Sequence, residues 1–310
     1  MASVIHRPVL LVQVIEALAP GRGGLIVDAT VGLGGHAHTL LGACADVRLL
    51  GLDLDPTALA LARERLAAFA DRVELVESSY RDLPALLTQR GETQVRGVLF
   101  DLGVSSLQLD TPNRGFSFRH DAPLDMRFAP RGMTAAELLS TLGEDELVQI
   151  LRAYGEEPRA RRVARAIVRA QARAPIRTTG ELHRIVAGAL PAVHHGIDPA
   201  TRTFQALRIV TNHELEDLPV ALEQATHFLA PGGRLAVIAF HSIEDRLVKH
   251  TLRRLSGRCV CPPGTTTCEC RPERLLELVT RRPLRPDAVE IAENPRARSA
   301  RLRVAERRRP

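Results

Sequence analysis

Short apolar runs alternate with helical patterns over roughly the first hundred residues, and this alternation limits the fold more than any other feature of the chain. Runs at residues 25–27, 49–54, 73–76 and 97–100 predict four buried strands. A helix is predicted from residue 56 to about 69, because proline is favoured in the first turn of a helix. Buried strands separated by helices pair in parallel, so we expect an α/β fold with a doubly wound sheet.

The middle of the chain follows a different pattern. No convincing buried strand occurs between about residues 111 and 216, whereas stretches rich in Ala, Leu and Arg predict helices there. The strand pattern then returns, so the helical segment is interpreted as an insertion after the fourth strand. The predicted division is a first part of the core at residues 1–110, a helical substrate-binding insertion at 111–216, and a second part of the core with a basic tail at 217–310.

The second part of the core begins with a long helix that ends near residue 229. A turn at residues 231–233 and a strand at 234–240 are expected next, and stretches at 276–280 and 300–305 are expected to close the sheet as two further strands. Between them, Ser242-Ile243-Glu244-Asp245 predicts a capping box that starts a helix.

Composition and hydropathy limit where the protein works. Hydrophobic residues make up 45% of the 310 residues and charged residues 25%, which is typical of a globular protein. No apolar run approaches the roughly 20 residues that span a bilayer. Residues 9–19 faintly resemble a signal peptide, but Gln13 and Glu16 interrupt the apolar run and favour an amphipathic helix. We therefore expect a cytoplasmic protein with no membrane partner.

Basic residues gather in one region of a chain whose net charge is +6. Eight arginines lie between residues 152 and 177, against two acids. Such a patch suits a polyanionic partner, and the plain alternative is the solvated face of a surface helix. Four of these arginines fall along one side of the predicted helix, opposite Ala160, Val163, Ala164 and Ile167. We call these four the arginine stripe: Arg162, Arg165, Arg169 and Arg173.

The most specific motif is a glycine-rich loop at residues 28–36, DATVGLGGH, between a predicted strand and a predicted helix. Glycines let the backbone turn sharply and approach a ligand. Asp53 closes the second strand 19 positions after Gly34, where an acid that binds a ribose is expected. Both a dinucleotide and S-adenosylmethionine (SAM) fit this pattern. Asp28 favours SAM, because it would repel a pyrophosphate and attract the cationic groups of SAM.

Aromatic and acidic side chains follow the later strands, at the edge where α/β proteins bind ligands. Tyr80 comes just after the third strand and can pack on an adenine, unless it is simply a half-buried aromatic. Asp101 ends the fourth strand and is a candidate for the site, although it can also cap a helix. Phe116, Phe118 and Phe128 can stack on a target base or belong to the core.

Two close cysteine pairs, Cys259 with Cys261 and Cys268 with Cys270, raise the question of a metal. In a cytoplasmic chain such pairs favour a metal over disulfides. Structural zinc usually takes cysteines separated by two residues, so the one-residue spacing weakens this interpretation. A structural zinc site with four thiolate ligands is therefore a hypothesis, in which the protein fills every position around the metal.

Several sequence blocks together resemble one family. They are HRPVLL at residues 6–11, the loop at 28–36, FDLGVSSLQLD at 100–110, RGFSF at 114–118, PLDMR at 123–127, TRTFQALRI at 201–209 and FHSIEDR at 240–246. In this order the blocks resemble the ribosomal RNA small subunit methyltransferase H family over nearly the whole chain.

This resemblance implies a fold, a reaction and a set of residues. The fold would be a Rossmann-like class I SAM-dependent methyltransferase domain with an inserted helical domain. The reaction would be methylation of N4 of a cytidine in the decoding region (P site) of 16S rRNA, within the small ribosomal subunit, by a monomer or a dimer. By similarity, the residues that contact the cofactor would be Gly34, Gly35, His36, Asp53, Tyr80, Asp101 and Gln108. Asp101 is also our candidate for polarising the cytosine amine.

Overall fold

The computed structural model describes residues 8–191, 198–261, 265 and 273–309. It divides into two compact units. The sheet unit comprises Met1–Gly103 and Leu215–Pro310, and the helical unit comprises Val104–Glu214. The predicted insertion at residues 111–216 overlaps the helical unit, and its role in binding a substrate stays a prediction.

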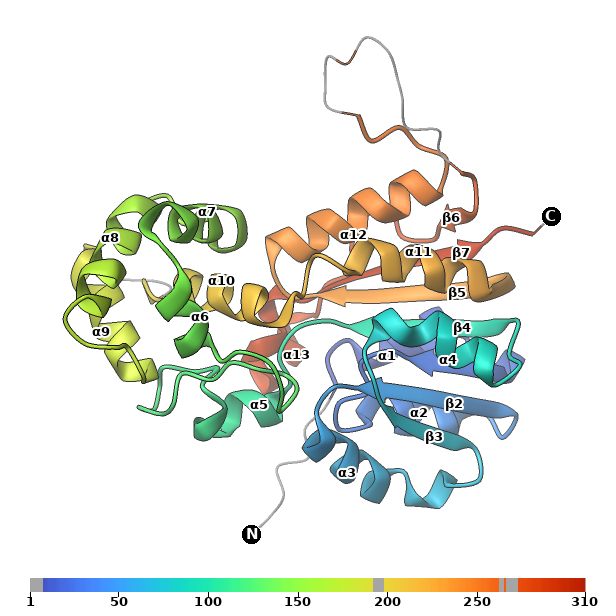
Figure 1. Ribbon diagram of the computed structural model, residues 1–310. Coiled ribbons are helices and arrows are strands. Elements are labelled where there is room, and N and C mark those ends of the chain that lie inside the picture. Colours follow the sequence, from blue (N-terminus) through green and yellow to red (C-terminus); the bar gives the residue numbers. More distant parts are fainter. Residues whose placement is uncertain (1–7, 192–197, 262–264, 266–272, 310) are drawn as a thin grey trace. The chain divides into compact units, whose positions relative to one another are not determined.

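A seven-stranded sheet forms the centre of the sheet unit, in the order β3-β2-β1-β4-β5-β7-β6 (Figure 1). The strands are β1 (Gly24–Asp28), β2 (Val47–Asp53), β3 (Val73–Glu77), β4 (Val95–Asp101), β5 (Leu229–Ala239), β6 (Leu276–Leu278) and β7 (Arg301–Arg307). The first five pair in parallel, whereas β7 runs antiparallel to both β5 and β6. The four early strands and the closing pair predicted from the sequence are confirmed.

Both faces of the central strands are apolar, which explains why the sequence shows near-continuous hydrophobic runs. Side chains alternate between the faces: Val98 and Phe100 of β4 belong to one buried cluster and Leu99 to the other. The first cluster includes Leu87 of α4 (Leu83–Gln89), and the second includes Leu40 of α2 (Gly35–Ala43). The sheet is therefore doubly wound, as the sequence predicts.

Helices cover the two faces of the sheet (Figure 1). Those that contribute to the first cluster are α4 (Leu83–Gln89), α11 (Leu218–Phe228) and α12 (Ser242–Leu255). Those that contribute to the second are α1 (Leu11–Leu18), α2 (Gly35–Ala43) and α3 (Pro56–Arg65). A short helix, α13 (Ala288–Glu293), precedes β7. The helix predicted to reach residue 69 is shorter, because α3 ends at Arg65 and a 3-10 turn, Ala67–Phe69, follows it.

The fifth strand starts earlier than the sequence predicts. Its residues 231–233, expected to form a turn before the strand, lie inside β5. The register with β4 shifts there, since Val95 pairs with Leu229 but Gly97 pairs with Arg234. Gly232 has φ +76°, a conformation that glycine adopts at little cost. The glycines therefore form a bulge within the strand.

Six helices make up the described part of the helical unit. They are α5 (Ser106–Asp110), α6 (Ala135–Thr141), α7 (Glu144–Gly155), α8 (Ala160–Gln171), α9 (Thr179–Ala189) and α10 (Thr201–Asn212). Capping boxes start α6 at Thr134 and α9 at Thr178, each closed by a glutamate three residues later. The unit has its own buried core, which includes Leu151, Ile167 and Leu207. Within its described residues the helical character predicted from the sequence is confirmed.

Candidate functional site

The glycine-rich loop connects β1 to α2 at the carboxyl edge of the sheet. Its backbone is tied to the neighbouring strands, since the Ala29 amide donates to the Leu99 carbonyl and the Val31 amide donates to the Leu52 carbonyl, both at 2.8 Å. Gly34 has φ +74°, and a Cβ on Gly35 would lie 2.4 Å from Cγ of Pro8. Larger residues at these two positions would strain or displace the backbone, which explains the glycines.

Gly32 presents a different environment from the other loop glycines. Its φ is +51°, and a Cβ at this position would meet nothing closer than the Thr30 carbonyl at 3.9 Å. Its amide donates a 2.8 Å hydrogen bond to Oδ2 of Asp53. The loop is therefore held by the acid that ends β2, and its glycine backbone faces open space, as a ligand-binding loop requires.

Four carboxylates end or follow four neighbouring strands at this edge. We call them the acid cluster: Asp28 at the end of β1, Asp53 at the end of β2, Asp101 at the end of β4, and Glu244 in the first turn of α12, after β5. Asp28 is 1% exposed and Glu244 is 2% exposed. The cluster raises the pKa of Asp28 to about 7, mainly through burial, which the Thr30 amide opposes and the charge of Asp53 reinforces. Burial also raises the pKa of Asp53, against hydrogen bonds from backbone amides that include those of Asp55 and Gly32.

Asp101 is the third acid of the cluster with a raised pKa. Burial, followed by the charges of Asp28 and Glu244, raises its pKa to about 8. Its Oδ1 atom is buried and has no hydrogen-bond partner within the described part of the chain. Its backbone amide donates to Oγ1 of Thr30 at 2.6 Å. Buried polar atoms are nearly always paired, so this oxygen marks a place where a ligand is expected to supply the partner.

The charge of the acid cluster distinguishes between the two cofactor classes left open by the sequence. Ionising a buried carboxyl group whose pKa is raised costs free energy, and a cation beside it offsets that cost. A pyrophosphate would increase it. The residues present therefore fit SAM, with its sulfonium and amino groups, and they oppose a dinucleotide.

Asp53 has the geometry expected of an acid that binds a ribose. Its Oδ2 accepts from the Gly32 amide at 2.8 Å and its Oδ1 accepts from the Asp55 amide at 2.9 Å. Each carboxylate oxygen can accept a second hydrogen bond, so both are able to receive hydroxyl groups. The role of Asp53 in the cofactor site stays a prediction that this geometry supports.

His36 lies in the first turn of α2 and is 5% exposed. Its Nε2 atom is 3.0 Å from the Val9 carbonyl oxygen, and its Nδ1 atom is 3.6 Å from Oδ2 of Asp101. The structure thus brings His36, Asp53 and Asp101 of the predicted set to one edge of the sheet, together with Gly34 and Gly35.

Tyr80 and Gln108 are placed differently. The Tyr80 ring packs edge-on against the buried Phe100, with ring centroids 5.6 Å apart. Gln108 belongs to the helical unit and is 4% exposed. Its Oε1 accepts from the Ser105 amide at 3.0 Å, and so it closes the capping box of α5. Adenine contact by Tyr80 and cofactor contact by Gln108 stay predictions.

Sequence reasoning missed Glu244. The motif at residues 242–245 was expected to cap a helix from Ser242, but the N-cap residue is His241, whose Nδ1 accepts from the Glu244 amide at 3.3 Å. Oε2 of Glu244 accepts from the Phe240 amide at 2.9 Å. The neighbouring Asp245 is paired with Arg303 at 2.6 Å and Arg301 at 3.0 Å. The available signal was an acid in the first helical turn after the last parallel strand.

Arg162, Arg165 and Arg169 of the arginine stripe lie on the exposed side of α8, and Arg173 is exposed just after the end of that helix. The four apolar residues predicted to lie opposite are buried. Arg165 pairs loosely with Glu144 at 3.5 Å. Within the described residues, the other three arginines of the stripe have no ion-pair partner. Their charges are therefore available to a polyanion, and RNA contact stays a prediction.

The three phenylalanines considered for base stacking pack in the core of the helical unit or against it. Phe116 is 8% exposed and stacks on Phe128, with centroids 5.6 Å apart. Phe118 stacks on His183 and meets Phe204 edge-on. Their packing favours the core alternative that the sequence left open.

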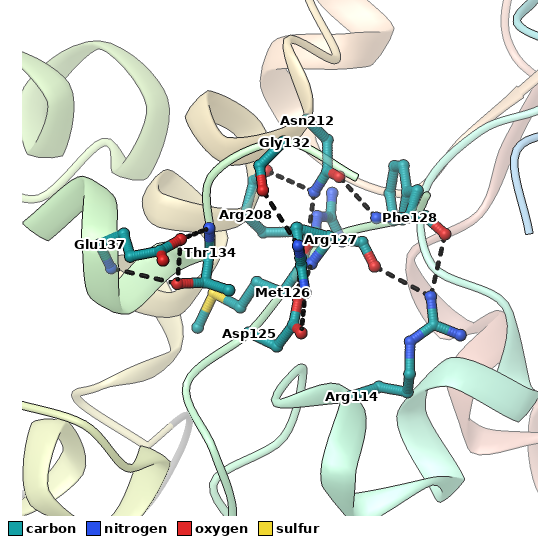
Figure 2. Close-up of polar contacts among 10 residues, drawn as sticks. All are labelled: Arg114, Asp125, Met126, Arg127, Phe128, Gly132, Thr134, Glu137, Arg208 and Asn212. Carbon is teal, nitrogen blue, oxygen red and sulfur yellow. Dashed lines mark hydrogen bonds and ion pairs between the residues drawn. The ribbon is translucent and has the colours of Figure 1, made fainter. Parts of the chain in front are cut away.

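The loop around Phe128 is held by polar contacts (Figure 2). Oδ1 of Asn212 accepts from the Phe128 amide, and its Nδ2 donates to the Met126 carbonyl, both at 2.7 Å. Arg114 donates to the carbonyls of Arg127 and Phe128 at 2.9 and 3.0 Å. These bonds hold Met126 at φ +61°, a conformation that non-glycine residues rarely adopt.

The zinc hypothesis falls partly outside the described residues, because Cys268 and Cys270 are not among them. Among the residues that are described, no group of three or more His, Cys, Asp or Glu side chains is arranged to hold a metal. The four-cysteine site stays a hypothesis. Across the same described residues, no helix has both the length and the apolar character needed to cross a bilayer.

Known proteins resemble this chain over nearly its whole length. A family model described as the MraW methylase family matches residues 3–308. A ribosomal RNA small subunit methyltransferase H from Thermomicrobium roseum is 50% identical over 307 residues, which cover 98% of this chain and 94% of the relative. A protein of the same name from Methylobacterium sp. (strain 4-46) is 50% identical over 310 residues, covering 99% and 92%.

Among solved structures, a putative rRNA methylase from Clostridium thermocellum matches with a TM-score of 0.45 and 14% identity. The match covers 98% of this chain and 100% of that one.

Proposed function

The chain belongs to the MraW methylase family, and from that premise we propose that it methylates N4 of a cytidine in the decoding region (P site) of 16S rRNA. It has the Rossmann-like class I SAM-dependent methyltransferase fold, with a helical segment after the fourth strand. The observation that carries the proposal is 50% identity, over 98% of this chain, to a protein named ribosomal RNA small subunit methyltransferase H. The proposed substrate is this rRNA within the small ribosomal subunit.

The acid cluster and the glycine-rich loop are the residues proposed to hold SAM. When bound, SAM supplies an electrophilic methyl group on a positively charged sulfur. Asp53 is placed to accept hydrogen bonds from ribose hydroxyls while it also holds the Gly32 amide at 2.8 Å. Asp28 and Asp101 supply negative charge within a buried environment, where an electrostatic attraction is stronger than in water.

Asp101 is the proposed acceptor for the target amine. The lone pair of the cytosine amino group is delocalised into the ring, which makes this group a poor nucleophile. A carboxylate that accepts a hydrogen bond from the amine returns electron density to nitrogen and then takes the proton that the amine loses. Asp101 ends β4 at the carboxyl edge, beside the glycine-rich loop, where such an acceptor is needed.

The arginine stripe is the proposed contact to rRNA phosphates. Its guanidinium groups stay charged at every physiological pH and suit the geometry of phosphate oxygens. Three of them have no ion-pair partner within the described residues, so binding an RNA would not require existing pairs to break. Such contacts position the RNA without reading its sequence.

Methyl transfer from labelled SAM to small ribosomal subunits from a strain that lacks the enzyme tests the proposal. Nucleoside mass spectrometry is expected to find N4-methylcytidine at one site. Subunits from a strain that contains the enzyme are the matched control, because their site is already modified and they should accept little label. Absence of transfer to subunits and to free rRNA, by a protein that binds SAM, would favour a non-catalytic RNA-binding factor instead.

A further inference from the structure

The two ring nitrogens of His36 have different partners, and this fixes the protonation of one of them. The Val9 carbonyl oxygen lies 3.0 Å from Nε2, and a carbonyl oxygen only accepts hydrogen bonds. Nε2 therefore carries a proton. Nδ1 then points toward Oδ2 of Asp101, 3.6 Å away. Nδ1 is thus placed to take a proton from this carboxyl group.

The ring cannot easily turn away from Asp101, because the chain before α1 covers it. Val9 and Leu10 are 7% and 0% exposed. Leu10 has φ +54°, and its amide donates a 2.6 Å hydrogen bond to Oε1 of Glu290. Pro8 packs directly on the backbone of Gly35. Residues 8–10 thus hold His36 in one orientation.

Asp101 needs a partner that takes its own proton if it is to accept a proton from an amine. Asp28 from β1 and Glu244 from α12 face it, and their charges, together with burial, raise its pKa to about 8. At pH 7 only about one-tenth of an isolated group with that pKa is ionised. A neutral carboxylic acid could donate a hydrogen bond to the amine but could not take its proton.

We propose that His36 is a positioning residue for methyl transfer, which takes the proton of Asp101 at Nδ1 and leaves the carboxylate ionised. The inference rests on the proposed function. In this step the O–H bond of Asp101 breaks and an N–H bond forms on His36, so that the pair keeps one proton and its net charge is unchanged. As the methyl group reaches the target amine, the proton that the amine loses passes to Asp101.

The charged groups around the pair favour this arrangement. An imidazolium at His36 faces Asp101 directly, and it reduces the repulsion that Asp101 experiences from Asp28 and Glu244. One cation also lies nearby, since Nη1 of Arg65 is 3.5 Å from the position of a Cβ on Gly35, the residue before His36. The carboxylate environment therefore stabilises a proton on His36.

The pH profile of the substitution His36→Gln tests the proposal. Glutamine can still donate an amide hydrogen bond toward the Val9 carbonyl, but it cannot hold the proton of Asp101. At saturating substrates we expect kcat to be about tenfold lower than wild type at pH 7 and to recover toward wild type at pH 9. The acid limb of the profile would then lie near pH 8, the pKa of Asp101 under the influence of burial, Asp28 and Glu244.

His38→Gln is the matched control, since His38 is exposed on the same helix and packs on Phe69. It should leave the profile unchanged. A loss of kcat in His36→Gln that is equal at all pH values would indicate a merely structural role and overturn the proposal. No loss at pH 7 would overturn it as well.

Nitrogen NMR of the ligand-free protein tests the same pair without turnover, and so it stands apart from the fate of the proposed function. The His36 signals, identified among 11 histidines by their absence in His36→Gln, should show both ring nitrogens protonated at pH 7. In Asp101→Asn, Nδ1 should lose its proton. A wild-type ring protonated only at Nε2 at pH 7 would refute the proposal.

Discussion

Replacing Asp28 with asparagine is expected to stabilise the ligand-free protein at neutral and alkaline pH. Asp28 ends β1, is 1% exposed, and accepts one 3.3 Å hydrogen bond from the Thr30 amide. Asparagine has the same shape and keeps an oxygen for that bond. What it removes is the cost of ionising a buried carboxyl group beside Asp53.

The size and sign of the effect follow from the pKa of Asp28. It is about 7 in the folded protein against an ordinary value of 3.8, so the folded state holds this proton to a higher pH than the unfolded state does. The free energy of unfolding therefore falls as pH rises from about 4 to about 7 and then levels off. Asparagine avoids this loss, which amounts to about 2 kcal/mol at pH 5 and about 4 kcal/mol at pH 8.

Scanning calorimetry measures this difference, and it suits a chain that contains no tryptophan. At about 2 °C per kcal/mol for a chain of this size, Tm of Asp28→Asn should exceed that of wild type by about 4 °C at pH 5 and about 8 °C at pH 8. Asp71→Asn, an exposed acid before β3, should not change Tm at either pH. An Asp28→Asn protein that is no more stable than wild type at pH 8, or whose advantage does not grow with pH, would refute the reasoning. Added SAM should raise Tm less in Asp28→Asn than in wild type, because the variant has lost a charge that attracts it.

Three further predictions concern the cofactor, the RNA and the metal. Asp53→Asn should weaken SAM binding by about 1–3 kcal/mol, or about 5- to 150-fold in Kd, through the loss of charge-assisted hydrogen bonds; unchanged affinity in calorimetry would remove Asp53 from the site. Replacing the whole arginine stripe with glutamine should weaken binding to rRNA and reduce the slope of log K against log salt by about 3, whereas Arg63→Gln on α3 should do neither; an unchanged slope would leave the stripe as a solvated face. If the four cysteines hold zinc, elemental analysis should find about one zinc per chain, and Cys268→Ser should lose it; a folded protein purified without metal would exclude the site.

The sheet was predictable because its physical signal is local. A strand covered on both faces needs consecutive apolar residues, and β1, β2 and β4 carry them. The start of β5 was less predictable, since residues 231–233 read as a turn in any local analysis. Their inclusion in the strand depends on pairing with β4, which lies more than a hundred positions earlier in the chain.

The candidate site was also predictable only where its signal is local. Asp28 and Asp53 were found because they end strands that adjoin the glycine-rich loop. Glu244 was not found, because its sequence context is fully explained by a helix cap. The contact of His36 with Asp101 joins residues 65 positions apart, and it arises from the parallel pairing of β1 with β4. No local pattern reports such a contact.

The strand order also explains why the acids are tolerated. Strands β2, β1, β4 and β5 are neighbours in the sheet, so four acids that end or follow them meet at the point where the chain order reverses, between β1 and β4. Without a ligand, their mutual repulsion is relieved by protons held on Asp28 and on the pair of Asp101 with His36. A bound cation relieves the same repulsion without protons. The acid cluster therefore costs the ligand-free protein stability, and that stored cost favours a cationic cofactor over an anionic one at the same glycine-rich loop.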